Sequence, residues 1–219
     1  MKLHYDPCTV NCRKVIAGLK LMGIDFESET YDYFDGLTEP SETGFRTLPA
    51  YLAINPMATL PALVDGDLNL WESNAILQYA ADAAGPSAAY PQDLKVRADI
   101  NLWLLWESNK WFASCYVYLV ENVVKPNVFK VDPDAAIVEA EDGNFHKLAG
   151  ILDTRLAGQS WISGNEPTIA DIVVAAPMHL HSYQKLPLSQ HGNVVAWYER
   201  LEGLPCWSST DVAPLLGLS

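Results

Sequence analysis

Residues 61–80, PALVDGDLNLWESNAILQYA, decide the fold of the amino-terminal third of this chain. Two short apolar runs flank Asp65-Gly66, and this dipeptide favours the positive φ angles that a tight β-hairpin turn requires. Apolar residues then recur at helical spacing from Ile76 onward, so we expect a helix over residues 72–84. The stretch therefore predicts two antiparallel strands followed by a helix.

The residues before this stretch alternate between strand and helix patterns. Apolar side chains recur at helical spacing between residues 11 and 22, and Gly23 is a typical helix stop. We expect, in chain order, a strand, a helix, a strand, a polar loop and a short helix at Leu3–Tyr5, 11–22, Phe26–Tyr33, Asp35–Thr47 and Pro49–Ile54. The order of the whole region is then βαβ, loop, ββ, α.

A run of Gly, Pro and Ser residues over Gly85–Pro91 marks the expected domain boundary. Beyond it strand patterns are almost absent. The longest helical stretch, Leu94–Val124, is expected to break at Pro126, which lacks a backbone N–H. Shorter helical patterns follow at Asp134–Leu156, Ile169–Tyr183 and Val194–Leu201. The sequence therefore predicts an α/β domain at 1–82, a linker at 83–93 and an all-helical domain at 94–219.

Composition narrows the classes of partner. The 219 residues carry a formal net charge of −13, which disfavours nucleic acid and anionic lipid surfaces as partners. No apolar stretch is long enough to span a membrane, and the first residues do not resemble a secretory signal, so we expect a cytoplasmic protein. The four cysteines lack nearby histidines in a zinc pattern, so free thiols and no metal site are expected.

Three motifs resemble those of the cytosolic glutathione transferase superfamily. Residues 55–63, NPMATLPAL, are similar to the segment that leads to the family's cis-proline. Residues 70–76, LWESNAI, are similar to its Glu-Ser glutathione signature, and 164–172, GNEPTIADI, to its capped helix in the second domain. Each motif alone is moderately specific, whereas three in the right order are strongly so. The resemblance implies a thioredoxin-like βαβ–ββα domain followed by a helical bundle, in a bacterial or fungal theta- or nu-like member.

The resemblance implies that Thr59, Leu60 and Pro61 bind the cysteinyl part of glutathione. A cis Leu60–Pro61 bond would expose the backbone N–H and C=O of Leu60 for strand-like pairing. A helix N-terminus carries free N–H groups and partial positive charge, so Ser73 is expected to bind the γ-glutamyl carboxylate and Glu72 its ammonium group. From the residues alone, a trans-proline at a strand edge and a simple helix cap are the alternatives.

Thr9 and Asn11 are the expected catalytic residues. The run Thr9-Val10-Asn11-Cys12-Arg13 is similar to the Ser-x-x-Cys-Arg pattern of theta-like members, with Thr9 in place of the serine. A free thiol has a pKa near 8.5, so a donor must favour its thiolate at neutral pH. The hydroxyl of Thr9 and the amide of Asn11 are such donors, as is the N-terminus of the helix that follows.

Cys8 and Cys12 offer an alternative nucleophile. Omega-like members of the family use a cysteine to form a mixed disulfide with glutathione, and Cys8 falls one residue before that position. Thr9 replaces the first cysteine of a thioredoxin-like C-x-x-C, so Cys12 is expected to be a packed helix residue. Cys8 remains open as a reactive thiol, because low-pKa cysteines favour helix N-termini.

The electrophile pocket is expected between the domains, with Pro7 and Cys8 on one wall and Trp106 and Lys110 on the other. The aromatic residues within 103–112 suit an apolar, planar substrate, although most are equally suited to core or dimer packing. Trp106 and Lys110 are expected to share a helix face by their spacing.

Three further polar positions have expected roles. The resemblance implies that Asp99 reaches glutathione of a partner subunit. Arg46 in the polar loop is expected either to meet the glycyl carboxylate or to be solvated. Thr168 and Asp171 fit a capping box that stabilises the second domain.

The sequence thus predicts an enzyme that activates the thiol of glutathione as thiolate and conjugates it to a hydrophobic electrophile. No metal or organic cofactor is expected, and the resemblance implies a homodimer. Other glutathione-dependent enzymes on this fold are alternatives, namely an ether lyase, dehalogenase, isomerase, peroxidase or Cys8-based thiol transferase. A non-enzymatic binding protein is a further one, because fold does not fix function.

Overall fold

The computed structural model describes residues 1–39 and 41–218, and the chain divides into two compact units, Met1–Ser87 and Ala88–Ser219. Pro40, part of the predicted polar loop, and Ser219, the end of the predicted helical domain, lie outside the described residues. No helix in the described part of the chain is both long and apolar enough to cross a membrane.

The first unit is built on a four-stranded mixed sheet. Its strands are β1 (Lys2–Tyr5), β2 (Glu27–Thr30), β3 (Ala62–Asp65) and β4 (Leu68–Trp71), in the spatial order β2-β1-β3-β4. β1 and β2 run parallel, while β3 is antiparallel to β1 and to β4. The predicted hairpin is confirmed, because Gly66 turns the chain between β3 and β4 with φ +60°, a conformation open to glycine.

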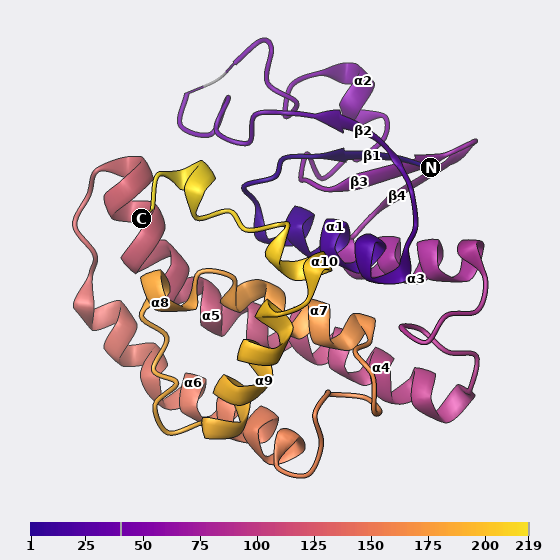
Figure 1. Ribbon diagram of the computed structural model, residues 1–219. Helices are drawn as coiled ribbons and strands as arrows, with labels where there is room; N and C mark the ends of the chain where they lie inside the picture. Colours follow the sequence, from indigo (N-terminus) through magenta and orange to yellow (C-terminus); the bar gives the residue numbers. More distant parts are fainter. Residues whose placement is uncertain (40, 219) are drawn as a thin grey trace. The chain divides into compact units, whose positions relative to one another are not determined.

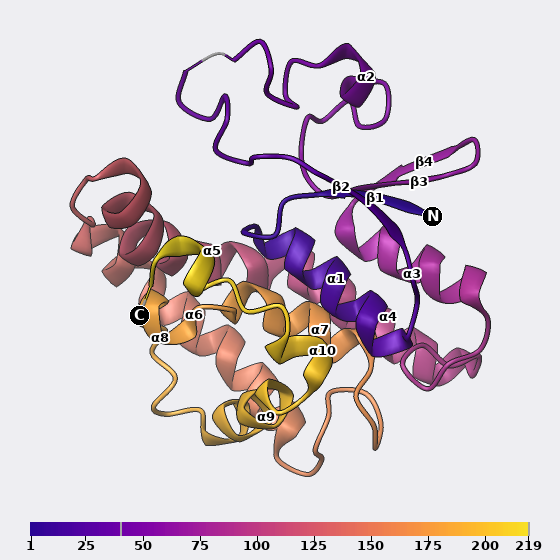
Figure 2. The same ribbon diagram turned by 45° about the horizontal axis from the view of Figure 1, so that its top comes forward.

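Helices cover the two faces of this sheet unequally (Figures 1 and 2). α1 (Val10–Met22) and α3 (Ser73–Ala84) lie on one face, and the short α2 (Pro49–Leu52) lies on the other. α1 approaches α3 closely at Gly18, where a Cβ would stand 2.5 Å from a methyl carbon of Leu77. Strand alternation sends Leu3 and Leu63 into the α1/α3 face, where both are fully buried. The thioredoxin-like arrangement is thereby confirmed.

The second unit is helical in its described residues. Its α-helices are α4 (Leu94–Trp106), α5 (Phe112–Leu119), α6 (Ala135–Leu156), α7 (Ile169–Ala175), α8 (His181–Gln184), α9 (Gly192–Glu202) and α10 (Pro205–Ser208). Two π-helical segments, η1 (Glu107–Trp111) and η2 (Val120–Phe129), join or extend them, and η3 (Ala176–Met178) and η4 (Pro214–Leu216) are 3₁₀ turns.

The predicted break at Pro126 is wrong. The helix continues through Pro126 to Phe129 because its last turns are π-helical, and the wider turn accommodates a residue without an N–H. The side-chain amide of Asn127 donates to the carbonyl of Val123 at 2.8 Å, which satisfies one of the carbonyls near the proline. The chain leaves the helix at Lys130, in the left-handed conformation.

The helix predicted over 169–183 is instead three short pieces, α7, η3 and α8. Pro177 cannot donate to the α-helical ladder, so the chain tightens into a 3₁₀ turn there. The capping box at the start of α7 is confirmed, with the Asp171 carboxylate accepting from the N–H of Thr168 at 2.8 Å. The same carboxylate accepts from the indole N–H of Trp197 at 2.9 Å, which fixes α9 to α7.

Candidate functional site

The loop between β1 and α1 is held by the buried carboxylate of Asp6. One oxygen accepts from the backbone N–H of Cys8 at 2.6 Å, and the other accepts from the N–H of Tyr33 at 2.7 Å. The carboxylate thus joins the β1–α1 loop to the segment that follows β2, and it fixes the backbone on which Thr9 lies. Sequence reasoning missed Asp6; its place at the end of a strand, immediately before Pro7, was the available signal.

Thr9 is the N-cap of α1. Its hydroxyl accepts from the N–H of Cys12 at 3.4 Å and donates to the carbonyl of Asp6, also at 3.4 Å. Both distances are long for hydrogen bonds, so the hydroxyl proton is only weakly committed to the protein. A half-buried hydroxyl at the positive end of a 13-residue helix can therefore turn toward an anionic ligand.

Asn11 and Ser73 lie together although 62 positions separate them. The Ser73 hydroxyl donates to the side-chain oxygen of Asn11 at 3.4 Å, which connects the first turn of α1 to the first turn of α3. The structure therefore brings together two of the predicted glutathione-binding residues. Because the Asn11 oxygen faces Ser73, its amide N–H groups are directed elsewhere and can donate.

Glu72 has the backbone angles φ +74° and ψ 111°, which are rare for a residue with a side chain. It precedes α3, caps the helix with no side-chain hydrogen bond, and its side chain is exposed. The N–H of Ile76 is the first in the helix to reach an intrahelical acceptor, the carbonyl of Glu72 at 3.0 Å. The amides ahead of Ile76 have no acceptor inside the helix, so this end can bind a carboxylate.

The Leu60–Pro61 peptide bond is cis, as the resemblance implies. The turn before it is fixed by Thr59, whose carbonyl accepts from the Tyr51 hydroxyl at 2.5 Å and from the Asn55 side chain at 2.7 Å. In the described part of the chain, no other residue hydrogen-bonds to the backbone N–H or C=O of Leu60. These two groups are therefore available to a strand-like ligand.

The environment of Cys8 favours the protonated thiol. Burial, followed by the charge of Asp6 and a hydrogen bond to its carboxylate, raises the pKa of Cys8 to about 11. Burial likewise raises the pKa of Cys12 to about 12, and Cys12 is fully buried in α1. A reactive cysteine needs the opposite surroundings, with cations or helix amides that stabilise the thiolate. The surroundings of Cys8 therefore do not favour a reactive thiolate there, and the contact of Thr9 with the sulfur of glutathione stays a prediction.

Asp99 and Arg46 already have partners inside their own units. The Asp99 carboxylate pairs with Arg155 and accepts from the Ser163 hydroxyl at 2.7 Å. Arg46 donates to the carbonyls of Tyr33 and Asp35 at 2.8 and 3.0 Å, so it supports the loop that follows β2. The contacts of Asp99 and Arg46 with glutathione stay predictions.

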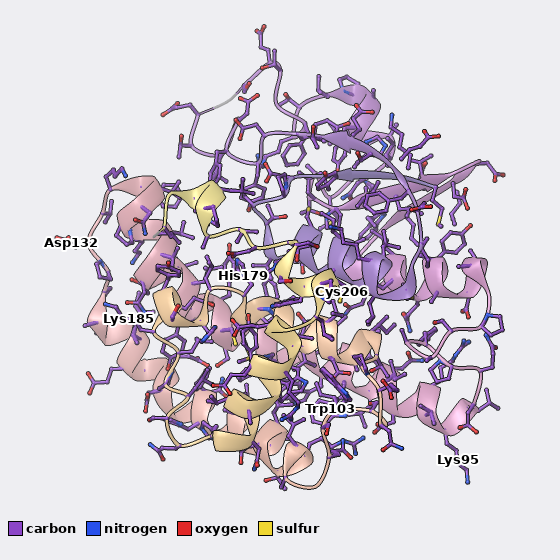
Figure 3. All side chains as sticks on the ribbon, viewed as in Figure 1. Lys95, Trp103, Asp132, His179, Lys185 and Cys206 are labelled. Atoms are coloured by element: carbon purple, nitrogen blue, oxygen red, sulfur yellow. The ribbon has the colours of Figure 1, made fainter. Side chains whose placement is uncertain are left out.

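The four predicted electrophile contacts differ in surroundings. Pro7 and Lys110 are exposed and Cys8 is half-buried. Trp106 stacks on Trp111, with ring centroids 5.6 Å apart and 18° between the ring planes. The stacked residues Trp106 and Trp111 are five positions apart across the π-helical segment η1, and the shared helix face of Trp106 and Lys110 stays a prediction. Trp103, marked in Figure 3, meets the Trp106 ring edge-on at 5.1 Å.

Comparison with known proteins supports the resemblance at the level of both domains. The family model described as "Glutathione S-transferase, N-terminal domain" matches residues 10–83, and that described as "Glutathione S-transferase, C-terminal domain" matches residues 110–205. A rice protein (Oryza sativa subsp. japonica), "Probable glutathione S-transferase GSTF2", is 30% identical over 218 residues, or 99% of this chain and 97% of its own.

Solved structures have the same fold. Glutathione transferase F7 from Populus trichocarpa superposes with a TM-score of 0.82 at 25% identity, over 95% of this chain and 96% of its own. Glutathione S-transferase-I, bound with lactoylglutathione, gives a TM-score of 0.82 at 24% identity, over 96% and 98% of the two chains. Rice and poplar are plants, so these comparisons give no support to a bacterial or fungal theta- or nu-like subclass. This chain belongs to the glutathione S-transferase family.

Proposed function

We propose that the protein transfers the glutathione sulfur to a hydrophobic electrophile. The observation that carries the proposal is the convergence of three features in the first unit: the unpartnered backbone of Leu60 at a cis-proline turn, the amide-bearing N-terminus of α3, and the contact of Ser73 with Asn11. Together they offer groups for the γ-glutamyl and cysteinyl parts of an extended γ-Glu-Cys-Gly ligand.

In this proposal, the γ-glutamyl carboxylate binds at Ser73, where amides without an intrahelical acceptor and the helix dipole favour an anion. Glu72, exposed beside it, receives the γ-glutamyl ammonium group. The cysteinyl backbone pairs with Leu60 as an added strand would, next to Thr59 and Pro61. The sulfur then lies near the hydroxyl of Thr9.

The chemical step is thiol activation followed by attack. Thr9 donates to the sulfur and Asn11 adds a second donor, so that the thiolate is favoured over the thiol at neutral pH. The thiolate attacks the electrophilic carbon, forms the C–S bond, and expels a leaving group or adds across a double bond. Holding both reactants together supplies the rest of the acceleration. We further propose that no cofactor takes part and that the active form is a homodimer.

The electrophile contacts are proposed as Pro7, Cys8, Trp106 and Lys110. An apolar substrate would lie against the indole of Trp106, and replacing Trp106 by alanine should then raise KM for apolar electrophiles with little effect on glutathione binding. The raised pKa of Cys8 argues against the rival thiol-transferase reaction, which needs a thiolate on the protein.

The deciding experiment measures binding and turnover separately. Calorimetric titration of the purified protein with glutathione should give saturable heat, and an activated aryl chloride should be converted to its glutathione conjugate. Ser73→Ala should weaken glutathione binding about 10- to 150-fold with a smaller effect on kcat, since one hydrogen bond to a charged group is lost. Ser28→Ala, at an exposed serine of β2, is the matched control.

A panel separates the other glutathione-dependent reactions, with a β-aryl ether, a dihalomethane, a hydroperoxide and a disulfide tested beside the aryl chloride. Conjugation of the aryl chloride without comparable turnover of the others supports transfer. Absence of both glutathione heat and conjugate would refute the proposal.

A further inference from the structure

A cavity of about 410 Å³ lies on the sheet face opposite α1 and α3, and Ala50 and Tyr51 of α2 contribute to its lining. The strand registers pair Lys2 with Val64, Val64 with Asn69, and His4 with Glu29, so these residues project from that same face. None of the residues proposed above to bind glutathione lines it. The volume is within the range of small-molecule sites.

One wall of the cavity is a row of four hydrogen-bonded polar side chains. Lys2 pairs with the Glu29 carboxylate, and the Tyr31 hydroxyl donates to the other oxygen of Glu29 at 3.0 Å. The Nδ1 atom of His4 lies 3.0 Å from the oxygen of the same hydroxyl. The row thus runs from a surface ion pair to a histidine that is only 4% exposed.

The row fixes which nitrogen of His4 carries the proton. The single hydroxyl proton of Tyr31 is donated to Glu29, because an ionised carboxylate can only accept. The Tyr31 oxygen must therefore accept from His4, which makes Nδ1 the protonated nitrogen. Burial lowers the pKa of His4, so the imidazole is neutral at pH 7 and Nε2 holds an unshared electron pair. No residue in the described part of the chain hydrogen-bonds to Nε2.

The remaining walls are apolar and aromatic. Leu48, Ile54 and Val64 supply aliphatic surface, and the Tyr51 ring stands 6.1 Å from His4 at an angle of 59°. The charge of Lys2 is already neutralised by Glu29, and the chain carries a net charge of −13, so an anionic ligand is disfavoured. A neutral ring that bears one good hydrogen-bond donor satisfies both the apolar walls and the basic nitrogen.

We propose that this cavity is a binding site for a small neutral phenol, whose hydroxyl donates to Nε2 of His4 while its ring packs against Tyr51, Leu48 and Ile54. Tyr31 is a positioning residue, because its hydroxyl holds the imidazole in the tautomer that accepts. The site is independent of the sulfur chemistry, and its occupant need not react.

The probe is 2-naphthol, with 2-methoxynaphthalene as the matched ligand that lacks a donor. Binding is measured by calorimetry on the full chain saturated with S-hexylglutathione, which fills the proposed transfer site. We expect one 2-naphthol per chain and an affinity about tenfold lower for the methyl ether, since one buried hydrogen bond is missing. The His4 Nε2 resonance in the NMR spectrum should move further with saturating 2-naphthol than with saturating ether, because only the naphthol donates a hydrogen bond to it.

Two alanines that are both exposed at α2 provide the protein variants. Ala50 lines the cavity and Ala53 does not, so Ala50→Leu should weaken 2-naphthol binding at least about tenfold while Ala53→Leu binds as the wild type does. Both variants should retain glutathione binding. Equal affinities for the two naphthalenes, unchanged His4 resonances, or wild-type binding by Ala50→Leu would each overturn the proposal, whatever the outcome for the transfer reaction.

Discussion

Replacing Thr9 by alanine tests the proposed thiol activation directly. The change removes a hydroxyl whose present contacts, with Asp6 and Cys12, are both 3.4 Å long, so little of the loss falls on the fold. A cap lost at such a distance should cost about 0.5–1 kcal/mol of stability. A hydrogen bond to the thiolate is charge-assisted and contributes about 1.5–3 kcal/mol.

The free energy of this charge-assisted hydrogen bond also sets the expected change in the thiol pKa and in activity. Each pKa unit corresponds to about 1.4 kcal/mol, so Thr9→Ala should raise the pKa of the bound glutathione thiol by about 1–2 units. For a wild-type thiol pKa near 7, the thiolate fraction at pH 7, and with it kcat/KM, should then fall about 5- to 50-fold. Glutathione affinity should change little, because Ser73, Glu72 and Leu60 are untouched.

The assay is a pH titration of the ultraviolet absorbance of the thiolate in the binary complex, run beside steady-state kinetics. Thr9→Ser is the control, because it keeps a hydroxyl at the same position and should restore most of the activity. A wild-type thiol pKa in Thr9→Ala would refute the reasoning. The same holds if Thr9→Ser is as inactive as Thr9→Ala.

Three further outcomes are expected. Glu72→Gly should raise the free energy of unfolding by about 1 kcal/mol, because glycine adopts φ +74° without strain. The same change should weaken glutathione binding, because the carboxylate is lost. Urea unfolding measures the first effect and calorimetry the second. Burial and then Asp6 raise the pKa of Cys8 to about 11, so alkylation of Cys8 by iodoacetamide at pH 8 should be about tenfold slower than that of a free cysteine. The alkylation should be faster in Asp6→Asn, and peptide mass spectrometry measures both rates. Burial, then the nearby His146, lower the pKa of His191 below 6.5, so the unfolded chain binds more protons there and stability should fall as the pH drops below 6.5. The denaturant midpoint of the wild type should therefore be lower at pH 5.5 than at pH 7.5, and this difference should be smaller in His191→Gln.

Local chemistry in the sequence was enough to predict much of the first unit. The dipeptide Asp65-Gly66 predicts the hairpin turn, and Gly23 ends its helix in the left-handed conformation. Thr168 and Asp171, three positions apart, form the predicted capping box. Each of these features depends on neighbours within a few positions.

The features that sequence reasoning missed depend on contacts between distant segments or on a changed helical period. The Asp6 carboxylate accepts a hydrogen bond from the N–H of Tyr33, 27 positions away, and no local sequence pattern predicts that pair. Pro126 predicts the end of a helix only where the turns are α-helical, and here they are π-helical. The cavity at His4 exists because a parallel strand brings Tyr31 beside it, and single-sequence patterns do not specify strand partners.

The segment from Glu107 to Trp111 has a consequence for how this chain can change. A wide turn accommodates roughly one residue more than an ordinary turn, and each residue advances a helix by about 100°. Deleting one residue here would restore the regular winding and leave the phase of the downstream side chains nearly unchanged, because the wide turn already absorbs the extra residue. Cys115 and Tyr118, which are buried now, would then stay in the core. The same deletion in a regular turn of the helix would instead rotate every downstream side chain by about 100°.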